Sequence, residues 1–332
     1  MNYSERILII NSSSIGDFIL SLPTLFAIRK KSPQGYIELM GKSEILGLAE
    51  NRFYVNKGIS IEINSLSNFF LEKDNLPDSL VKYFKSFQII FTFLNDREGI
   101  FLKNLKRTGA EKIYSLDKPS PEAFKEHATI EYSKIIKPLG IELNIKKPKI
   151  FLNKQDRKFA DNFIKSKLSI NQKNYYVAIH PGSGSKKKNW SFDNFVKLSE
   201  KLKNEFNCNI LLLSGPAESP KIIKEKNCFI NASGLSLIEL ASILEKCSLY
   251  IGNDSGITHL ASAVGIPVIA IFGPTNVNVW KPTGNNIRII YKEISCSPCS
   301  REKMSSCAQQ KCIELIDVNE VFEACKNIIK KT

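Results

Sequence analysis

The chain has 332 residues, of which 43% are hydrophobic and 24% charged, a composition that is typical of a folded globular protein and excludes a disordered one. Its 47 Lys and Arg residues against 33 Asp and Glu residues give a formal net charge of +14. That charge indicates an anionic partner (a nucleotide, a phosphorylated lipid or a membrane surface) or else a solvated, lysine-rich surface. No membrane-length apolar stretch, signal-peptide pattern or basic stripe with aromatic residues is present, so we expect a cytoplasmic protein that does not bind nucleic acid.

Short apolar runs alternate with amphipathic stretches along the chain, which predicts an α/β protein with parallel sheets. Strands are expected at residues 7–10, 36–40, 61–63, 88–93 and 112–116, and then at 175–179, 209–213, 229–231, 249–251, 268–272 and 287–291. Helices are expected over residues 15–26, 157–167, 192–202 and 237–244. A Lys- and Pro-rich stretch near residue 145 separates the halves, so we predict two Rossmann-like domains, 1–165 and 172–315, and a terminal helical segment, 316–332.

Loops that follow strands are where Rossmann-like sheets bind ligands. The first such loop, Asn11–Asp17, is small and polar, and its Gly16 permits close backbone approach. Asp17 begins the next helix, where a carboxylate could accept a proton from a sugar hydroxyl; the alternative is that it only caps the helix. The loop is neither a G-x-G-x-x-G fingerprint nor a P-loop, so neither a redox dinucleotide nor ATP hydrolysis is indicated.

Three loops of the second half carry groups that suit a nucleoside diphosphate. His180–Trp190 offers glycines, serines and lysines to a diphosphate, although a solvated charge run is the alternative. Asp254 and Ser255 precede a helix whose N-terminus favours phosphate, and a histidine follows one turn later. Glu218 could accept hydrogen bonds from a ribose, or be an ordinary exposed loop residue. No DxD motif is present, so lysine and helix N-termini, not Mg²⁺, are expected to neutralise the diphosphate.

In this order and spacing, the segments resemble glycosyltransferase family 9, the ADP-heptose:lipopolysaccharide heptosyltransferases. The similarity lies in ILIINSSSIGDFILSLPTLFAIRKKSP, HPGSGSKKKNW and GNDSGITHLASAVGIPVIAIFGPT, and more weakly in GIFLKNLKRTGAEKIYSLDKP, in His127–Tyr132 and in SGLSLIELASILEKCSLYIGND. It spans nearly the whole chain. The resemblance implies a GT-B fold, with two Rossmann-like domains facing a central cleft. The first would bind the acceptor and the second the nucleotide sugar, and the terminal helix would pack back on the first domain.

The resemblance also implies the reaction, an inverting, metal-independent transfer of heptose from ADP-heptose to a lipopolysaccharide core. It implies Asp17 as the general base, with Ser13 and Gly16 shaping the loop around the sugar. The donor would be held by residues of the second domain, namely Lys188, Ser183, Ser185, Glu218, Asp254, Ser255, Gly256 and His259. The acceptor-side segment, residues 43–78, shows no match. Another nucleotide sugar or a protein hydroxyl acceptor is therefore an alternative, while a lipid-linked acceptor would give peripheral contact with the inner face of the membrane.

Four cysteines near the C-terminus, Cys296, Cys299, Cys307 and Cys312, include one C-x-x-C pair. Four thiolates could hold a structural zinc or iron ion, as the cysteine-rich tails of some family members suggest. Two disulfides or four free thiols are the alternatives.

Two function classes outside glycosyl transfer suit the same scaffold. A nucleotide-binding oxidoreductase would need a dinucleotide fingerprint, which the first loop lacks. A non-catalytic sugar-nucleotide binder would have no need of Asp17. Fold alone does not decide between these classes, so the loops carry the argument.

Overall fold

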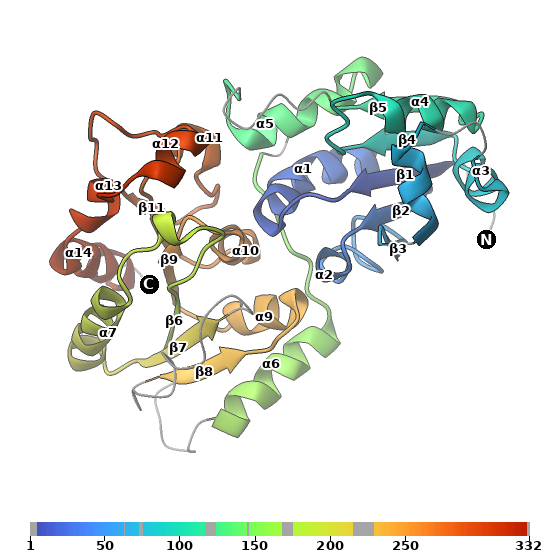
Figure 1. Ribbon diagram of the computed structural model, residues 1–332. Helices are drawn as coiled ribbons and strands as arrows, with labels where there is room; N and C mark the ends of the chain where they lie inside the picture. The colour runs from blue at the N-terminus through green and yellow to red at the C-terminus, as the bar shows by residue number, and fades with distance from the viewer. Residues whose placement is uncertain are drawn as a thin grey trace. The chain divides into compact units, whose positions relative to one another are not determined.

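The computed structural model describes residues 5–62, 64–72, 76–116, 124–144, 146–167, 175–214 and 229–330. The chain divides into two compact units, Met1–Lys146 and Lys147–Thr332. Over the described residues, each unit is built on a parallel sheet with helices on its faces (Figure 1). The predicted α/β class with two Rossmann-like domains is therefore confirmed.

The described part of the first unit contains a five-stranded parallel sheet in the order β3-β2-β1-β4-β5. Its strands are β1 (Arg6–Asn11), β2 (Tyr36–Gly41), β3 (Lys57–Ser60), β4 (Ile89–Thr92) and β5 (Lys112–Ser115). Its helices are α1 (Ile15–Lys31), α2 (Ser43–Leu46), α3 (Asp78–Lys85), α4 (Ile100–Arg107) and α5 (Ala128–Ser133), with the 3-10 helices η1 (Asn64–Phe70) and η3 (Lys134–Leu139). Ile90 of the sheet packs with Phe84 of α3 and Phe101 of α4 in one buried cluster.

The third strand lies earlier in the chain than expected. The apolar residues of the segment 61–63 predict a strand there, but β3 is Lys57–Ser60 and pairs with β2 at the sheet edge. An edge strand that is only half-buried does not need an apolar sequence, so the hydrophobic pattern by which a strand is predicted is weak there. Ile61 packs against the core just beyond the strand, which explains why an apolar pattern misplaces it.

The second unit contains, among its described residues, a six-stranded parallel sheet in the order β11-β10-β9-β6-β7-β8. Its strands are β6 (Tyr176–His180), β7 (Asn209–Ser214), β8 (Ile230–Ser233), β9 (Leu249–Asn253), β10 (Val268–Ile271) and β11 (Ile287–Ile290). Its helices are α6 (Lys154–Lys167), η4 (Lys186–Lys188), α7 (Phe192–Phe206), α9 (Leu237–Leu244), α10 (Gly256–Val264), α11 (Val277–Trp280), α12 (Arg301–Ser306), α13 (Lys311–Glu314) and α14 (Val318–Ile329).

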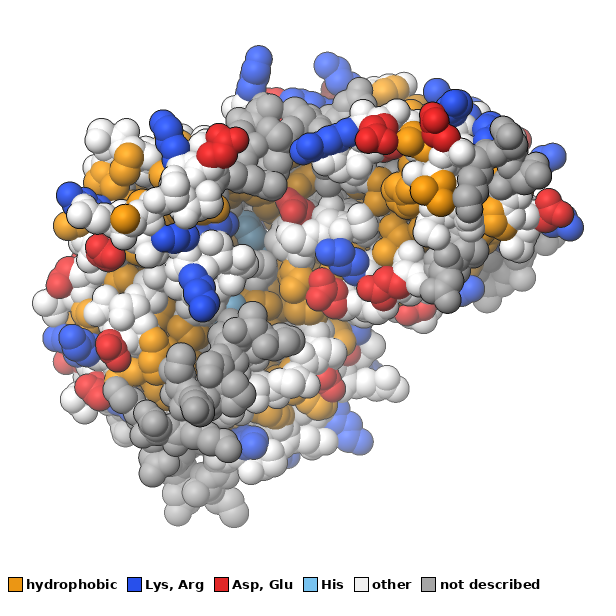
Figure 2. Space-filling view, viewed as in Figure 1, with side chains coloured by type: hydrophobic (Ala, Val, Ile, Leu, Met, Phe, Trp, Pro, Cys, Tyr) orange, Lys and Arg blue, Asp and Glu red, His pale blue; other side chains and the backbone are white. Residues whose placement is uncertain are grey.

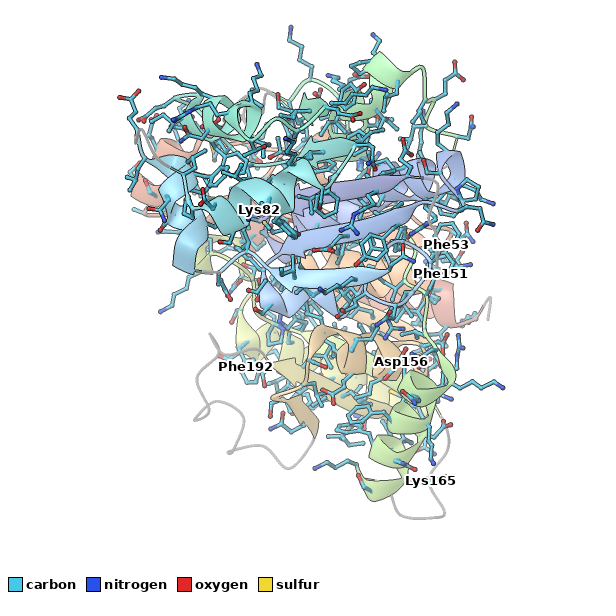
Figure 3. All side chains as sticks on the ribbon, turned by 90° about the vertical axis from the view of Figure 1, so that its right-hand side faces the viewer. Phe53, Lys82, Phe151, Asp156, Lys165 and Phe192 are labelled. Atoms are coloured by element: carbon cyan, nitrogen blue, oxygen red, sulfur yellow. The ribbon has the colours of Figure 1, made fainter. Side chains whose placement is uncertain are left out.

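The division between the units falls before α6, whereas the sequence suggests a first domain that continues to residue 165. The reason is that α6 packs against α9 of the second unit. Arg157 binds the Glu245 carboxylate through two nitrogens, each 2.8 Å from an oxygen. Figure 3 shows α6 with Asp156 near its start and Lys165 near its end, the arrangement that suits the helix dipole.

The terminal helix α14 packs beside α7 in the second unit (Figure 1). Its buried face, formed by Val321, Ala324 and Cys325, joins the core beneath the sheet. Packing of this helix on the first unit stays a prediction.

In the part of the chain that the structure describes, no helix has both the length and the apolar character needed to cross a bilayer.

Each sheet has one point at which the chain order reverses. In the first unit this point lies between the neighbouring strands β1 and β4, and in the second between β6 and β9. The loops beyond the carboxyl ends of such strands are the usual ligand sites of open α/β sheets. The predicted site loops follow β1, β6 and β9, so the fold places them where a ligand is expected.

Candidate functional site

The loop after β1 is shaped by the last residue of that strand. Asn11 is fully buried, and its side-chain oxygen accepts the N–H of Ser13, 3.0 Å away. Its amide nitrogen lies 3.3 Å from the hydroxyl of Ser21 in α1. One side chain therefore ties the start of the loop to the helix that follows, and Gly16 falls in the first turn of that helix.

Asp17 is half-buried in the first turn of α1, but Ser14, not Asp17, is the N-cap. The Ser14 hydroxyl lies 2.7 Å from one Asp17 oxygen, to which it donates, and it also accepts the Asp17 N–H at 3.5 Å. The hydroxyl of Tyr132 in α5 donates to the other Asp17 oxygen. One oxygen therefore belongs to the cap of α1, through Ser14, while the other binds a side chain from a different helix, so capping alone does not account for this carboxylate.

The loop after β6, residues 181–190, is held by Asn253 at the end of the neighbouring strand β9. Asn253 is fully buried; its amide donates to the carbonyl of Pro181 (2.6 Å) and accepts the N–H of Trp190 (3.0 Å). Trp190 is itself buried, and its indole N–H donates to the carbonyl of Ile316 (2.9 Å). Both ends of the lysine-bearing loop are thus fixed to the sheet.

Inside this loop, the predicted serines serve the loop itself. The Ser183 hydroxyl lies 2.8 Å from the Ser185 carbonyl and 2.6 Å from the side-chain oxygen of Asn189. The Ser185 hydroxyl caps η4 by accepting the N–H of Lys187. Their hydrogen bonds set the path of the backbone that leads to the three lysines.

The three lysines have different environments. Lys188 Nζ lies 2.8 Å from an oxygen of Asp254, whose side chain is only 6% exposed. Lys187 Nζ donates to the carbonyl of Cys307 at 2.6 Å, and Lys186 is exposed. The structure therefore pairs two predicted donor residues, Lys188 and Asp254, from loops 66 positions apart.

A buried polar network lies at the start of α10. Ser255 caps the helix through the N–H of Thr258, and its hydroxyl also lies 3.4 Å from Nδ1 of His180. The Thr258 hydroxyl donates to the carbonyl of Asn253 and lies 3.0 Å from the hydroxyl of Tyr250. This network fixes the first turn of α10, whose free N–H groups and dipole favour an anion.

Gly252 is required by that network. A Cβ at this position would lie 2.4 Å from the Tyr250 hydroxyl and 2.8 Å from its ring carbon Cζ, closer than a real Cβ can approach. Gly256 is the first residue of α10, and His259 is buried one turn along it. Glu218 falls outside the described residues.

The sequence gives no role to several residues on which the site depends. Asn11 and Asn253 each end a strand and hold the loop beyond it, and a fully buried asparagine at a strand end is the signal that identifies such residues. Tyr132 belongs to a segment that resembles the family without an assigned role. Its proximity to Asp17, 115 positions away, is visible only in the fold.

The cysteine-bearing tail lies against the loop after β10. The Ser297 hydroxyl donates to the carbonyl of Gly273 (2.9 Å), and the Cys299 N–H donates to that of Pro274 (2.8 Å). Burial, followed by the neighbouring thiols, raises the pKa of Cys312 to about 11, and the same causes raise the pKa of Cys299.

The predicted metal ligands are therefore neighbours but do not form a site as placed. Cys296, Cys299, Cys307 and Cys312 are free thiols, with no disulfide among them. Among the described residues, no group of three or more His, Cys, Asp and Glu side chains is arranged to hold a metal ion. A structural zinc or iron at these cysteines stays a prediction.

The family model of glycosyltransferase family 9 (heptosyltransferase) matches residues 101–309. The chain belongs to glycosyltransferase family 9. The matched range includes the lysine-bearing loop and all of α10, the two segments that meet at Lys188 and Asp254. The protein is accordingly a glycosyltransferase.

Similarity to glycosyltransferases extends over nearly the whole chain. The lipooligosaccharide heptosyltransferase 2 of Campylobacter jejuni serotype O:2 is 25% identical over 330 residues, 96% of each chain. The family 9 structure from Veillonella parvula aligns with a TM-score of 0.77 at 19% identity, over 99% of this chain and 98% of that one. The structure of E. coli heptosyltransferase WaaC with ADP aligns with a TM-score of 0.66 at 16% identity, over 97% and 99%. The GT-B fold expected from the resemblance is confirmed.

One structural neighbour contains a metal. The iron-containing dodecameric glycosyltransferase TibC of enterotoxigenic E. coli aligns with a TM-score of 0.63 at 14% identity, over 99% of this chain and 80% of that one. At this identity the likeness shows the shared fold only. The similarity is therefore no evidence that the cysteines of this chain bind iron.

Proposed function

We propose that this glycosyltransferase moves heptose from ADP-heptose to a lipopolysaccharide core or a related lipid-linked saccharide, with inversion and without a catalytic metal. The observation that carries the proposal is the Lys188–Asp254 pair in front of the first turn of α10. ADP as the nucleotide is supported by the E. coli heptosyltransferase structure solved with ADP, and the acceptor class by the similar lipooligosaccharide heptosyltransferase of Campylobacter jejuni.

The second unit offers what a departing nucleoside diphosphate needs. The Lys188 ammonium has three protons, of which the Asp254 contact occupies one, so two can reach phosphate oxygens. The first N–H groups of α10 add a fixed partial positive charge. Charge that is already in place when the diphosphate leaves lowers the barrier, which is how a transferase can work without Mg²⁺.

Asp254 and His259 suit the sugar more than the phosphates. A carboxylate repels phosphate oxygens but accepts hydrogen bonds from sugar hydroxyls, and the Asp254 carboxylate is held beside Lys188 by their 2.8 Å contact. Ser255 and Gly256 complete the helix start to which the diphosphate would bind.

The first unit offers the base. In the proposed step an acceptor hydroxyl gives its proton to Asp17 while its oxygen forms a bond to the anomeric carbon. The bond from that carbon to the diphosphate breaks on the opposite side, so the configuration inverts and the nucleoside diphosphate leaves as an anion. Removal of a positioned general base typically slows such a step by about 10²- to 10⁴-fold.

Neither a metal nor a cofactor is assigned to the transfer step. The cysteines of the tail are not arranged as metal ligands, so we derive no step from them.

The basic side chains in Figure 2 are scattered among acidic ones on the face shown, with no single basic stripe. A lipid-linked acceptor would bring the enzyme to the inner face of the membrane as a peripheral protein.

The donor assignment is tested by thermal unfolding with ADP, GDP, UDP, dTDP and NAD in turn. A ligand at a hundred times its dissociation constant stabilises the fold by about 2.7 kcal/mol, which is readily measured. We expect a selective response to ADP that is lost in Lys188→Ala and retained in Lys186→Ala, which removes the same charge from an exposed position. A selective response to another nucleotide would replace the ADP-sugar, and no response to any would refute the donor site.

A further inference from the structure

We propose that Tyr132 is a positioning residue for the base: its hydroxyl fixes one oxygen of the Asp17 carboxylate and so sets the orientation of the base. The inference rests on the proposed function, because Tyr132 has this role only if Asp17 is the base. It adds a residue to which the sequence analysis gives no role.

The Tyr132 side chain has little freedom to move. It is 2% exposed, and its ring packs edge-on against Phe93 and Phe124, with centroids 6.4 Å and 5.9 Å away. A close-packed ring keeps one rotamer, so the surrounding core determines where the hydroxyl points. The donor to Asp17 is thereby in place before any substrate binds.

The short helix α5 that carries Tyr132 is itself held at its start. His127 caps it by accepting a backbone N–H of the first turn. The buried Glu131 carboxylate accepts two N–H groups of the preceding loop and binds Lys134. These contacts do not involve the Tyr132 hydroxyl, so they stay when that hydroxyl is removed, and α5 also packs along α1.

The two hydroxyls that donate to Asp17, those of Ser14 and Tyr132, differ in whether water can replace their hydrogen bond. Ser14 is exposed, so water can take over its hydrogen bond. The Tyr132 hydroxyl comes from a buried ring, and its loss leaves nothing of equal geometry. Burial, together with the charge of Asp17 and the hydrogen bond to it, raises the pKa of Tyr132, so the phenol stays protonated and keeps its donor role.

This geometry leaves Asp17 able to act. Each carboxylate oxygen can accept two hydrogen bonds, so a substrate hydroxyl can approach an oxygen that already binds Tyr132 or Ser14. Tyr132 therefore orients the base and leaves it able to accept a proton from the substrate.

The first unit contains a second buried contact between a tyrosine hydroxyl and a carboxylate, which serves as a control for Tyr132 and Asp17. The hydroxyls of Tyr83 and Tyr36 donate to Glu38, which lies within β2 and is only 3% exposed. The Glu38 carboxylate is closed to solvent, whereas Asp17 is half-buried at a strand-end loop. Tyr83→Phe thus removes the same kind of hydrogen bond from a carboxylate outside the proposed site.

The experiment compares Asp17→Asn, Tyr132→Phe and Tyr83→Phe with the unaltered protein. Transfer from ADP-heptose to deacylated lipooligosaccharide is followed by ADP release. We expect Tyr132→Phe to lower kcat roughly tenfold with the donor KM unchanged. Tyr83→Phe should change neither kcat nor the donor KM.

A second measurement does not depend on turnover. Carbon-13 NMR of labelled aspartate carboxyl groups reports the environment of each carboxylate directly, and the Asp17 signal is the one absent from Asp17→Asn. In Tyr132→Phe the chemical shift of this signal at neutral pH should change, because a hydrogen bond to the carboxylate is lost, and in Tyr83→Phe it should stay the same. An unchanged Asp17 signal and an unchanged kcat in Tyr132→Phe would overturn the inference, while an inactive Asp17→Asn would leave the proposed function standing. A fully active Asp17→Asn would overturn both.

Discussion

Replacement of Asn253 by alanine should loosen the lysine-bearing loop at both ends. The side chain is fully buried, and its removal deprives the Trp190 N–H and the Pro181 carbonyl of their partners. A buried group left without its hydrogen bond costs about 1–3 kcal/mol, so the two together should lower the free energy of unfolding by roughly 2–6 kcal/mol. For a unit of this size, at about 2–4 °C for each kcal/mol, that corresponds to a fall in Tm of about 4–24 °C.

The measurement is thermal unfolding of the full chain with and without ADP. Asn231→Ala is the control, because Asn231 is exposed on β8. We expect the large fall in Tm in Asn253→Ala alone, accompanied by a weaker response to ADP, since Lys188 is displaced with its loop. A loss of stability no greater than that of Asn231→Ala would show that Asn253 does not hold the loop.

Two further predictions concern stability in each unit. In Gly252→Ala the new methyl group would overlap the Tyr250 hydroxyl, so the free energy of unfolding should fall by about 1–3 kcal/mol, whereas Gly184→Ala, with open space around its Cα, should change it little. Burial raises the pKa of Glu131, but its hydrogen bonds, first of all from Lys134, outweigh burial and hold it below the ordinary value of 4.5. Its contribution is therefore complete above about pH 4.5 and is lost as the pH falls, so urea unfolding of Glu131→Gln should show lower stability at neutral pH and a smaller decline on acidification; an unchanged pH dependence would refute this reading.

The sequence by itself determines the fold class and the location of the loops. Strands of parallel sheets are buried on both faces, so nearly all of them stand out as apolar runs, and a polar, glycine-bearing segment after such a run is where a ligand loop is expected. The half-exposed β3 is the exception, since its residues have no reason to be apolar. The order of the segments was sufficient to indicate the family.

Only the tertiary structure decides which side chains meet. The pairing of Lys188, and not its two neighbours, with Asp254 depends on the path that Asn253 and Ser183 impose on the loop. The contact of Tyr132 with Asp17 joins positions 115 residues apart and depends on how α5 packs along α1. Local patterns describe which face of an element is apolar, but a hydrogen bond between distant side chains is fixed by the packing of whole helices, and no local pattern records that packing.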